Sequence, residues 1–128
     1  KNTLIVDAYN ANPTSMEAAL NNFASVVAER KVAMLGDMLE LGEESVLEHI
    51  QVVRKALVSG IDLVCFVGGE FAKAVDAVRA EGEACDSLLC FTTSQELADW
   101  LEANPITDTA VLIKGSRGTR MEKVITVL

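Results

Sequence analysis

The stretch "TLIVDAYNANPTS" (residues 3–15) joins an apolar run to a polar turn and then to a helix start. Its first four residues have the length and β-branched content of a buried strand. Thr14 and Glu17 have the spacing of a capping box. Asn12 followed by Pro13 offers a rival N-cap, with proline at the first helical position. The stretch therefore predicts a strand, a loop and a helix in immediate succession.

Apolar runs of the same kind recur along the chain. They are "TLIV" (3–6), "VAML" (32–35), "LVCFV" (63–67), "LLCF" (88–91) and "AVLI" (110–113). None of these runs shows the polar–apolar alternation of a half-exposed strand, so each is predicted to be a strand buried on both faces.

Helical periodicity follows each of the runs. Apolar residues recur every three or four positions, as one face of a helix requires: Met16, Ala19, Leu20, Phe23 and Val27; Val46, Ile50, Val53 and Leu57; Phe71, Ala74, Val75 and Val78; Leu97 and Leu101; Met121, Val124, Ile125 and Leu128. Further capping boxes are predicted at Ser45/Glu48, Thr93/Glu96 and Thr119/Glu122. Strand–helix units in series predict an α/β fold, a Rossmann-like, doubly wound, mostly parallel sheet of five or six strands flanked by helices. A sixth strand has no clear match in the sequence.

Length and composition limit the classes of protein that this chain can represent. The 128 residues are enough for one domain with a substantial core. The net charge of −8 argues against a nucleic-acid surface. We expect a cytoplasmic domain with no membrane span, because no apolar stretch approaches the ~20 residues of a spanning helix and no leader opens the chain. Cys65, Cys85 and Cys90 lack metal-ligand spacing and are predicted to be structural thiols in a reducing compartment.

Polar loops follow three of the predicted strands, where a parallel sheet binds its ligands. In the first, "DAYNANP" (7–13), Asp7 could accept a hydrogen bond from a ribose hydroxyl, and Tyr9 could stack on a planar ring. Asn10 and Asn12 offer both donors and acceptors. A plain turn built by Asn and Pro remains the alternative reading of this loop. The loop "TTSQ" (92–95) is predicted to be a plain helix cap.

The loop "KGSRG" (114–118) is the second candidate. Its residues Lys114, Ser116 and Arg117, with two glycines before a predicted helix start, suit an anion. The guanidinium of Arg117 could bind a carboxylate through two hydrogen bonds. The alternative is a glycine-rich turn with solvated charges. This loop is not a Walker P-loop, because GxxxxGK[ST] is absent from the sequence.

The acidic loop "GDMLELGEES" (36–45) is the third candidate. Asp37 and Glu40 could receive an ammonium group or a Mg²⁺-bound water, and a solvated acidic loop is an equally open reading. His49 is expected to be partly buried and hydrogen-bonded rather than a catalytic base. With one histidine, no Ser–His–Asp or Cys–His set can be assembled, so we predict neither a catalytic residue nor a metal ligand in this chain.

Taken together, "DAYNANPTSM", "MLGDMLELGEES" and "KGSRGTRMEKV" resemble the C-terminal domain of the Mur ligases over residues 2–128. Family members commonly carry two acids where this chain has Val6-Asp7. The resemblance implies the last domain of a three-domain, ATP-dependent ligase that adds D-alanyl-D-alanine to a UDP-N-acetylmuramoyl-tripeptide in peptidoglycan synthesis. The first domain would bind the UDP-sugar peptide, and the central one would carry the P-loop and the Mg²⁺ sites. The last domain would close over ATP and receive the amine substrate, and alone it is expected to be inactive.

The resemblance also implies roles for individual residues. Asp7 would contact the ATP ribose, with Tyr9, Asn10 and Asn12 around the nucleotide. Near the incoming dipeptide would lie Asp37, Met38, Lys114, Ser116 and Arg117, with Lys114 or Arg117 on its carboxylate. The expected partners are these small molecules and the protein's own N-terminal and central domains, without nucleic acid. One alternative is a folylpolyglutamate synthase-like ligase domain, against which "GDMLELGE" argues. Another is a stand-alone nucleotide-binding regulatory module.

Overall fold

Strands and helices alternate along the chain in the computed structural model, which describes residues 1–7 and 10–128. The strands are β1 (Thr3–Asp7), β2 (Lys31–Gly36), β3 (Leu63–Val67), β4 (Leu88–Phe91) and β5 (Ala110–Lys114). The α-helices are α1 (Pro13–Ala24), α2 (Ser45–Leu57), α3 (Gly69–Ala80) and α4 (Ser94–Ala103). Three 3-10 segments complete the described chain: η1 (Gly42–Glu44), η2 (Arg117–Thr119) and η3 (Met121–Val127). Every predicted strand is therefore confirmed to within one or two residues.

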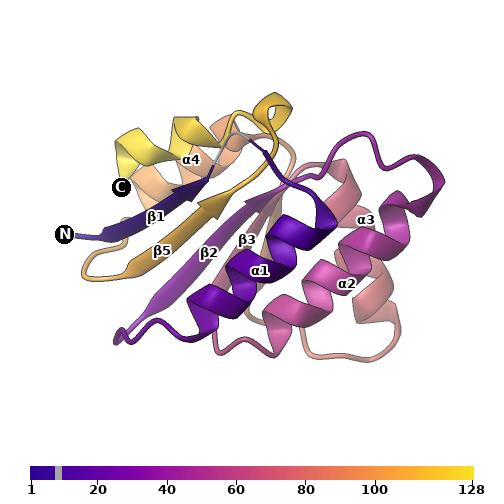
Figure 1. Ribbon diagram of the computed structural model, residues 1–128. Helices are drawn as coiled ribbons and strands as arrows, with labels where there is room; N and C mark the ends of the chain where they lie inside the picture. Colours follow the sequence, from indigo (N-terminus) through magenta and orange to yellow (C-terminus); the bar gives the residue numbers. More distant parts are fainter. Residues whose placement is uncertain (8–9) are drawn as a thin grey trace.

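The strands form one sheet in the order β1-β5-β2-β3-β4, and every neighbouring pair is parallel. Helices α1, α2 and α3 cover one face, while α4 and η3 cover the other (Figure 1). This arrangement confirms the predicted doubly wound α/β fold. The part of the chain that the structure describes contributes five strands to the sheet and no sixth.

The core divides into two clusters because successive side chains of a strand point to opposite faces of the sheet. In β2, Ala33 and Leu35 pack under α1–α3, whereas Val32 and Met34 pack under α4 and η3. The three inner strands β2, β3 and β5 are almost wholly buried, as predicted.

Burial on both faces was the wrong prediction for the two outer strands. In β1, Ile5 and Val6 are 40% and 45% exposed, and in β4 Cys90 is exposed. Each of these strands pairs with a neighbour on one side only. The helix layers do not fully cover these two outer strands. Cys65, in the inner strand β3, is buried, and this burial raises the pKa of its thiol to about 12.

Two of the predicted helix starts hold in the structure. Asn12 is the N-cap of α1: its Oδ1 accepts the Ser15 N–H at 2.9 Å, and Ser15 Oγ accepts the Asn12 N–H at 3.0 Å. The capping box predicted at Thr14/Glu17 is wrong, because the helix already begins at Pro13 and Thr14 lies inside its first turn. At α4, Thr93 Oγ1 accepts the Glu96 N–H at 3.1 Å, as predicted.

The other two predicted boxes are wrong because each hydroxyl makes a hydrogen bond elsewhere, Ser45 to another helix and Thr119 to a nearby carbonyl. Ser45 Oγ donates to Glu70 Oε1 of α3 at 2.7 Å, and η1 rather than a side chain precedes α2. Thr119 Oγ1 donates to the Ser116 carbonyl at 2.7 Å. The segment after Thr119 is also a 3-10 helix, not the α-helix that its periodicity predicts.

Gly68 provides a test of the junction between β3 and α3. Its φ is +115°, a conformation that side chains rarely adopt, and an added Cβ would overlap the buried carboxylate of Asp37. We expect Gly68→Ala to lower the free energy of unfolding by at least about 2 kcal/mol, measured by urea denaturation. The control is Gly69→Ala, whose Cβ meets no atom within 4 Å and which should change stability by less than about 0.5 kcal/mol. Equal losses for the two variants would contradict this reading.

Candidate functional site

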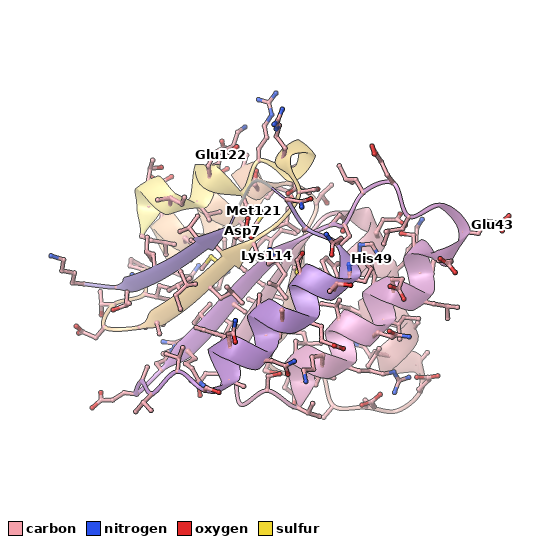
Figure 2. The ribbon with its side chains drawn as sticks, viewed as in Figure 1. Asp7, Glu43, His49, Lys114, Met121 and Glu122 are labelled. Carbon is pink, nitrogen blue, oxygen red and sulfur yellow. The ribbon has the colours of Figure 1, made fainter. Side chains whose placement is uncertain are left out.

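The carboxyl ends of the parallel strands bring the predicted polar loops to one edge of the sheet. Asp7 ends β1 and Lys114 ends β5, and the two residues are direct partners in the strand register. Figure 2 shows them side by side at this edge. Because β5 lies between β1 and β2, the "KGSRG" loop lies between the first loop and the acidic loop.

Lys114 joins the first loop to "KGSRG" across 107 sequence positions. Its Nζ donates to Asp7 Oδ2 at 2.7 Å and to the Asn10 carbonyl at 3.1 Å. The Lys114 side chain is 2% exposed, whereas that of Asp7 is 55% exposed. A buried ammonium group requires such partners. Lys114 is thus committed to holding the loop in place, while the second carboxylate oxygen of Asp7 still faces solvent.

The three predicted loops meet around an opening of about 300 Å³, which we call the three-loop opening. Its lining residues are Asn10, Ala11, Leu39, Glu40, Ser116, Arg117 and Gly118. Asn10, Ser116 and Arg117, all predicted from sequence, are therefore brought together. The other two predicted residues of the first loop, Asn12 and Tyr9, do not line this opening in the described structure. The side-chain oxygen of Asn12 is used in the helix cap, and Tyr9 lies outside the described residues.

Asp37 is nearly buried at the start of α3. Its carboxylate accepts the Glu70 N–H at 3.0 Å and the Phe71 N–H at 2.9 Å, two amides that the helix leaves unpaired. The negative charge also suits the positive end of the helix dipole. Asp37 is therefore an anchor for α3, and it lines a second hollow described below. Met38 is 1% exposed and packs in the core, so it is not among the residues that line either hollow.

His49 is fully buried beneath the acidic loop. Its Nε2 accepts the Met38 N–H at 3.0 Å, so the ring proton lies on Nδ1, which donates to the Ser45 carbonyl at 2.7 Å. Both ring nitrogens are thus used by the backbone, and the neutral ring lies 4.0 Å from Asp37 Oδ1. The expectation of a hydrogen-bonded rather than catalytic histidine is confirmed, with more complete burial than predicted.

Further hydrogen bonds fasten these elements to one another. Ser116 Oγ donates to the Asp37 carbonyl at 2.9 Å, which joins "KGSRG" to the acidic loop. The hydrogen bond from Ser45, followed by the hydrogen bond from Lys73, lowers the pKa of Glu70 on α3. The positive helix end predicted after "KGSRG" is a 3-10 turn of three residues, so it supplies less dipole than an α-helix would.

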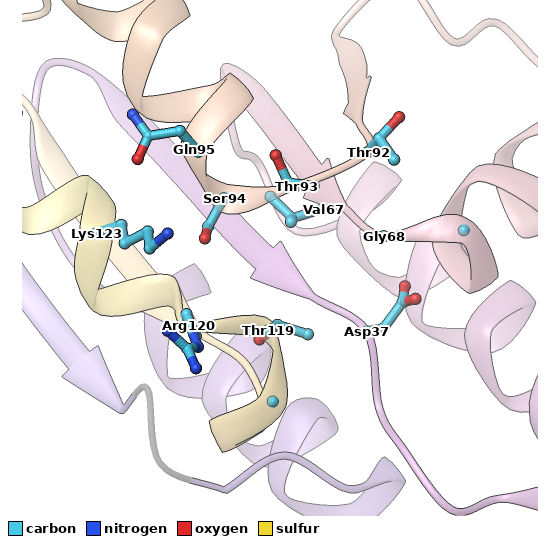
Figure 3. A pocket seen from close by; sticks show the side chains of 12 residues that line it. Asp37, Val67, Gly68, Thr92, Thr93, Ser94, Gln95, Thr119, Arg120 and Lys123 are labelled. Atoms are coloured by element: carbon cyan, nitrogen blue, oxygen red, sulfur yellow. The ribbon is translucent and has the colours of Figure 1, made fainter.

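A larger hollow, which we call the α3–α4 cleft, lies beside the three-loop opening and has a volume of about 460 Å³. It is lined by Asp37, Val67, Gly68, Gly69, Thr92, Thr93, Ser94, Gln95, Gly118, Thr119, Arg120 and Lys123 (Figure 3). Sequence reasoning missed Arg120 and Lys123, and it treated "TTSQ" as a cap only. The available signal was two further cations directly after "KGSRG".

Neither a metal-binding cluster nor a membrane-spanning helix is found in residues 1–7 and 10–128. This part of the chain has no group of three or more His, Cys, Asp or Glu side chains arranged to hold a metal ion. The same residues include no helix with the length and apolarity needed to cross a membrane.

Comparison with known proteins gives a consistent set of matches. A family model described as "Mur ligase, glutamate ligase domain" matches residues 1–117. UDP-N-acetylmuramoyl-tripeptide–D-alanyl-D-alanine ligase of Escherichia coli is 38% identical over 125 residues, which is 98% of this chain and 26% of that protein. The enzyme of the same name from Treponema pallidum is 37% identical over 122 residues, 95% of this chain and 26% of that protein. This chain thus spans about a quarter of the length of these relatives.

Solved structures agree with the sequence matches. MurF from Acinetobacter baumannii superimposes with a TM-score of 0.79 at 31% identity, over 98% of this chain and 27% of that one. MurF from Thermotoga maritima in complex with ADP gives a TM-score of 0.75 over 97% of this chain and 27% of that one. The second pair is only 23% identical, so it supports the fold alone.

The hydrogen bonds of His49 generate a stability prediction. His49→Phe keeps a ring against Phe71 but leaves the Met38 N–H without its partner and removes the ring N–H that the Ser45 carbonyl accepts. We expect a loss of about 1–3 kcal/mol in the free energy of unfolding, because a buried unpaired group costs about that much. His49→Gln, which offers both a donor and an acceptor, should lose less. Gln51→Ala, an exposed change on the same helix, is the control. Equal stability of the Phe and Gln variants, in urea unfolding, would refute the role of these bonds.

Proposed function

We propose that this chain, which belongs to the Mur ligase family, is the C-terminal domain of a three-domain ligase that joins D-alanyl-D-alanine to a UDP-N-acetylmuramoyl-tripeptide. The relatives named for this reaction match 95–98% of the chain, and the chain matches only about a quarter of each of them. The observation that carries the proposal is the meeting of the three motif loops at one sheet edge, through the bonds of Lys114 to Asp7 and of Ser116 to Asp37.

The nucleotide would be bound at the end of β1. Asp7 is half exposed and keeps one carboxylate oxygen without a described partner, so it can accept a hydrogen bond from a ribose hydroxyl. Asn10 is exposed beside it, and the side-chain NH₂ of Asn12 remains a donor while its oxygen caps α1. The resemblance also assigns Tyr9, which lies outside the described residues, to the nucleotide. ATP is the nucleotide that we assign to these residues.

The amine substrate would approach through the three-loop opening, where Ser116 and Arg117 lie. Asp37 lines the adjoining α3–α4 cleft, while Met38, which the resemblance also assigns to the substrate, lies next to it in the core. Lys114 is better assigned to positioning than to substrate binding, because its ammonium group is buried against Asp7 and Asn10. Of the two cations that the resemblance offers for the dipeptide, the structure therefore favours Arg117.

In this reaction the γ-phosphoryl group of ATP passes to the peptide carboxylate, giving an acyl phosphate and ADP. The amine nitrogen of D-alanyl-D-alanine then attacks the acyl carbon, phosphate leaves, and the amine loses a proton. Mg²⁺ would be held mainly by the central domain, as the family resemblance implies. The contribution of this chain is to close over ATP and to orient the amine. With ATP and a nucleotide-linked acceptor as substrates, the enzyme would work in the cytoplasm.

The alternatives raised by the sequence gain no support from the structure. The relatives described above are named as D-alanyl-D-alanine ligases, which supports that function over a folylpolyglutamate synthase-like domain or a stand-alone regulatory module.

The proposal predicts that activity needs the full-length protein that contains this chain. That protein should release phosphate from ATP only when both D-alanyl-D-alanine and the UDP-linked tripeptide are present. The 128-residue chain alone should release none and should bind ATP with a Kd of about 1 mM or weaker, because one wall of the site is missing. Calorimetry that gave micromolar binding to the isolated chain would instead support the stand-alone module.

A second prediction concerns Asp7 in the full-length protein. Asp7→Asn should raise the KM for ATP by about tenfold, since a hydrogen bond to a charged group contributes about 1.5–3 kcal/mol. Lys114→Met is the matched control: it breaks the same ion pair but leaves the Asp7 carboxylate in place. If both variants raised the KM for ATP equally, Asp7 would act through loop geometry and not through contact with the nucleotide.

A further inference from the structure

Glu40, in the acidic loop, has a backbone conformation that costs stability. Its φ is +64°, in the left-handed region where a Cβ crowds the following carbonyl oxygen. Two residues later the loop has a φ of +60° at Gly42, where the lack of a side chain removes this strain. Strained residues of this kind concentrate at functional sites. The side chain of Glu40 is therefore a candidate for a role that glycine could not perform.

The position of Glu40 is at the rim of the three-loop opening, which Ser116 and Arg117 also line. Among the described residues that line this opening, Glu40 is the one acid. It is exposed, and its carboxylate makes no hydrogen bond or ion pair with any residue of 1–7 or 10–128. Both of its oxygens are thus available to a molecule that enters the opening.

The other groups at this edge that could accept a proton are already in use. The two carboxylate oxygens of Asp37 accept two amides of α3. His49 is fully buried, and both of its ring nitrogens bind backbone groups. Asp7 is paired with the ammonium group of Lys114 at 2.7 Å. Elimination therefore leaves Glu40 as the free proton acceptor beside the opening.

The reaction proposed above needs such an acceptor. When the amine nitrogen attacks the acyl carbon, its lone pair forms the new N–C bond and the nitrogen becomes positively charged. The C–O bond to phosphate breaks, and phosphate leaves with the electron pair. The nitrogen then carries one proton more than the amide product. A carboxylate within hydrogen-bond reach of that nitrogen can accept the proton.

We propose that Glu40 is the general base that accepts the proton from the attacking nitrogen. One oxygen of its carboxylate takes the proton and becomes a carboxylic acid, and the exposed side chain then releases the proton to water. Before the transfer, the negative charge stabilises the positively charged nitrogen. This inference rests on the proposed function, and it adds a catalytic residue to a chain in which the sequence indicated none.

The first test is Glu40→Gln in the full-length protein, which removes the proton acceptor but keeps the size of the side chain. The kcat for ligation of D-alanyl-D-alanine should fall by about a hundredfold, the lower end of the usual contribution of a general base. The KM values for ATP and for the dipeptide should stay within about twofold. Phosphoryl exchange between ADP and ATP with the UDP-linked tripeptide, which needs no amine, should continue at its original rate.

Glu43→Gln is the matched control for the same loop. Glu43 is also an exposed acid, but it lies at the outer tip of the loop, away from Asp7 and Lys114 (Figure 2). Its kcat should therefore stay within about twofold of that of the unchanged protein.

Glu40→Gly separates the carboxylate from the conformation of the loop. Glycine suits a φ of +64°, so this variant should not unfold at a lower urea concentration than the unchanged protein, although it loses the base. Formate, a small carboxylate that fits the space left by the side chain, should restore part of the kcat. It should not restore the Glu40→Gln variant, whose amide still fills that space.

Several outcomes would overturn the inference. One is a kcat of Glu40→Gln within about twofold of the original value, and another is a glycine variant that formate does not restore. A rise in the dipeptide KM with an unchanged kcat would make Glu40 a binding residue and not a base. Loss of the ADP–ATP exchange would assign Glu40 to the nucleotide step. If the unchanged protein shows this exchange but no dipeptide-dependent ligation, the proposed function fails and this inference fails with it.

Discussion

The site depends on one buried ammonium group. Lys114 ends the strand between β1 and β2, and at 2% exposure it cannot be solvated by water. Its charge is compensated by Asp7 at 2.7 Å and by the Asn10 carbonyl at 3.1 Å. Because an unpaired buried charge would be costly, these bonds hold the first loop against the end of β5. The same contacts leave half of Asp7 exposed, so a single interaction both shapes the loop and presents its carboxylate.

A second group of bonds holds the acidic loop, and all of them involve backbone atoms. His49 binds the Met38 amide from below, Asp37 binds two amides of α3, and Ser116 binds the Asp37 carbonyl from the side. Three separate elements therefore converge on two consecutive residues. Backbone anchors of this kind fix the path of a loop while its exposed side chains stay free to contact a substrate.

Two hollows lie at this edge, and Gly118 lines both of them. The three-loop opening is lined by residues of the three motif loops, including Asn10, Ser116 and Arg117. The α3–α4 cleft is lined by Arg120, Lys123 and residues 92–95, which the sequence analysis did not assign to a ligand.

The sequence by itself determined the local structure, because strand length, helical period and the Asn12-Pro13 and Thr93 caps depend on neighbouring residues. It also indicated the three loops, through residue types that need no knowledge of the sheet. Only the tertiary structure decided which strands lie at the edges, why the hydroxyl of Ser45 leaves its predicted cap, and that Lys114 is buried. The order β1-β5-β2-β3-β4 brings together residues up to 107 positions apart. Arg120 and Lys123 lie across the α3–α4 cleft from the start of α4. The fold brings these distant segments together, and no periodicity in the sequence reveals such a contact.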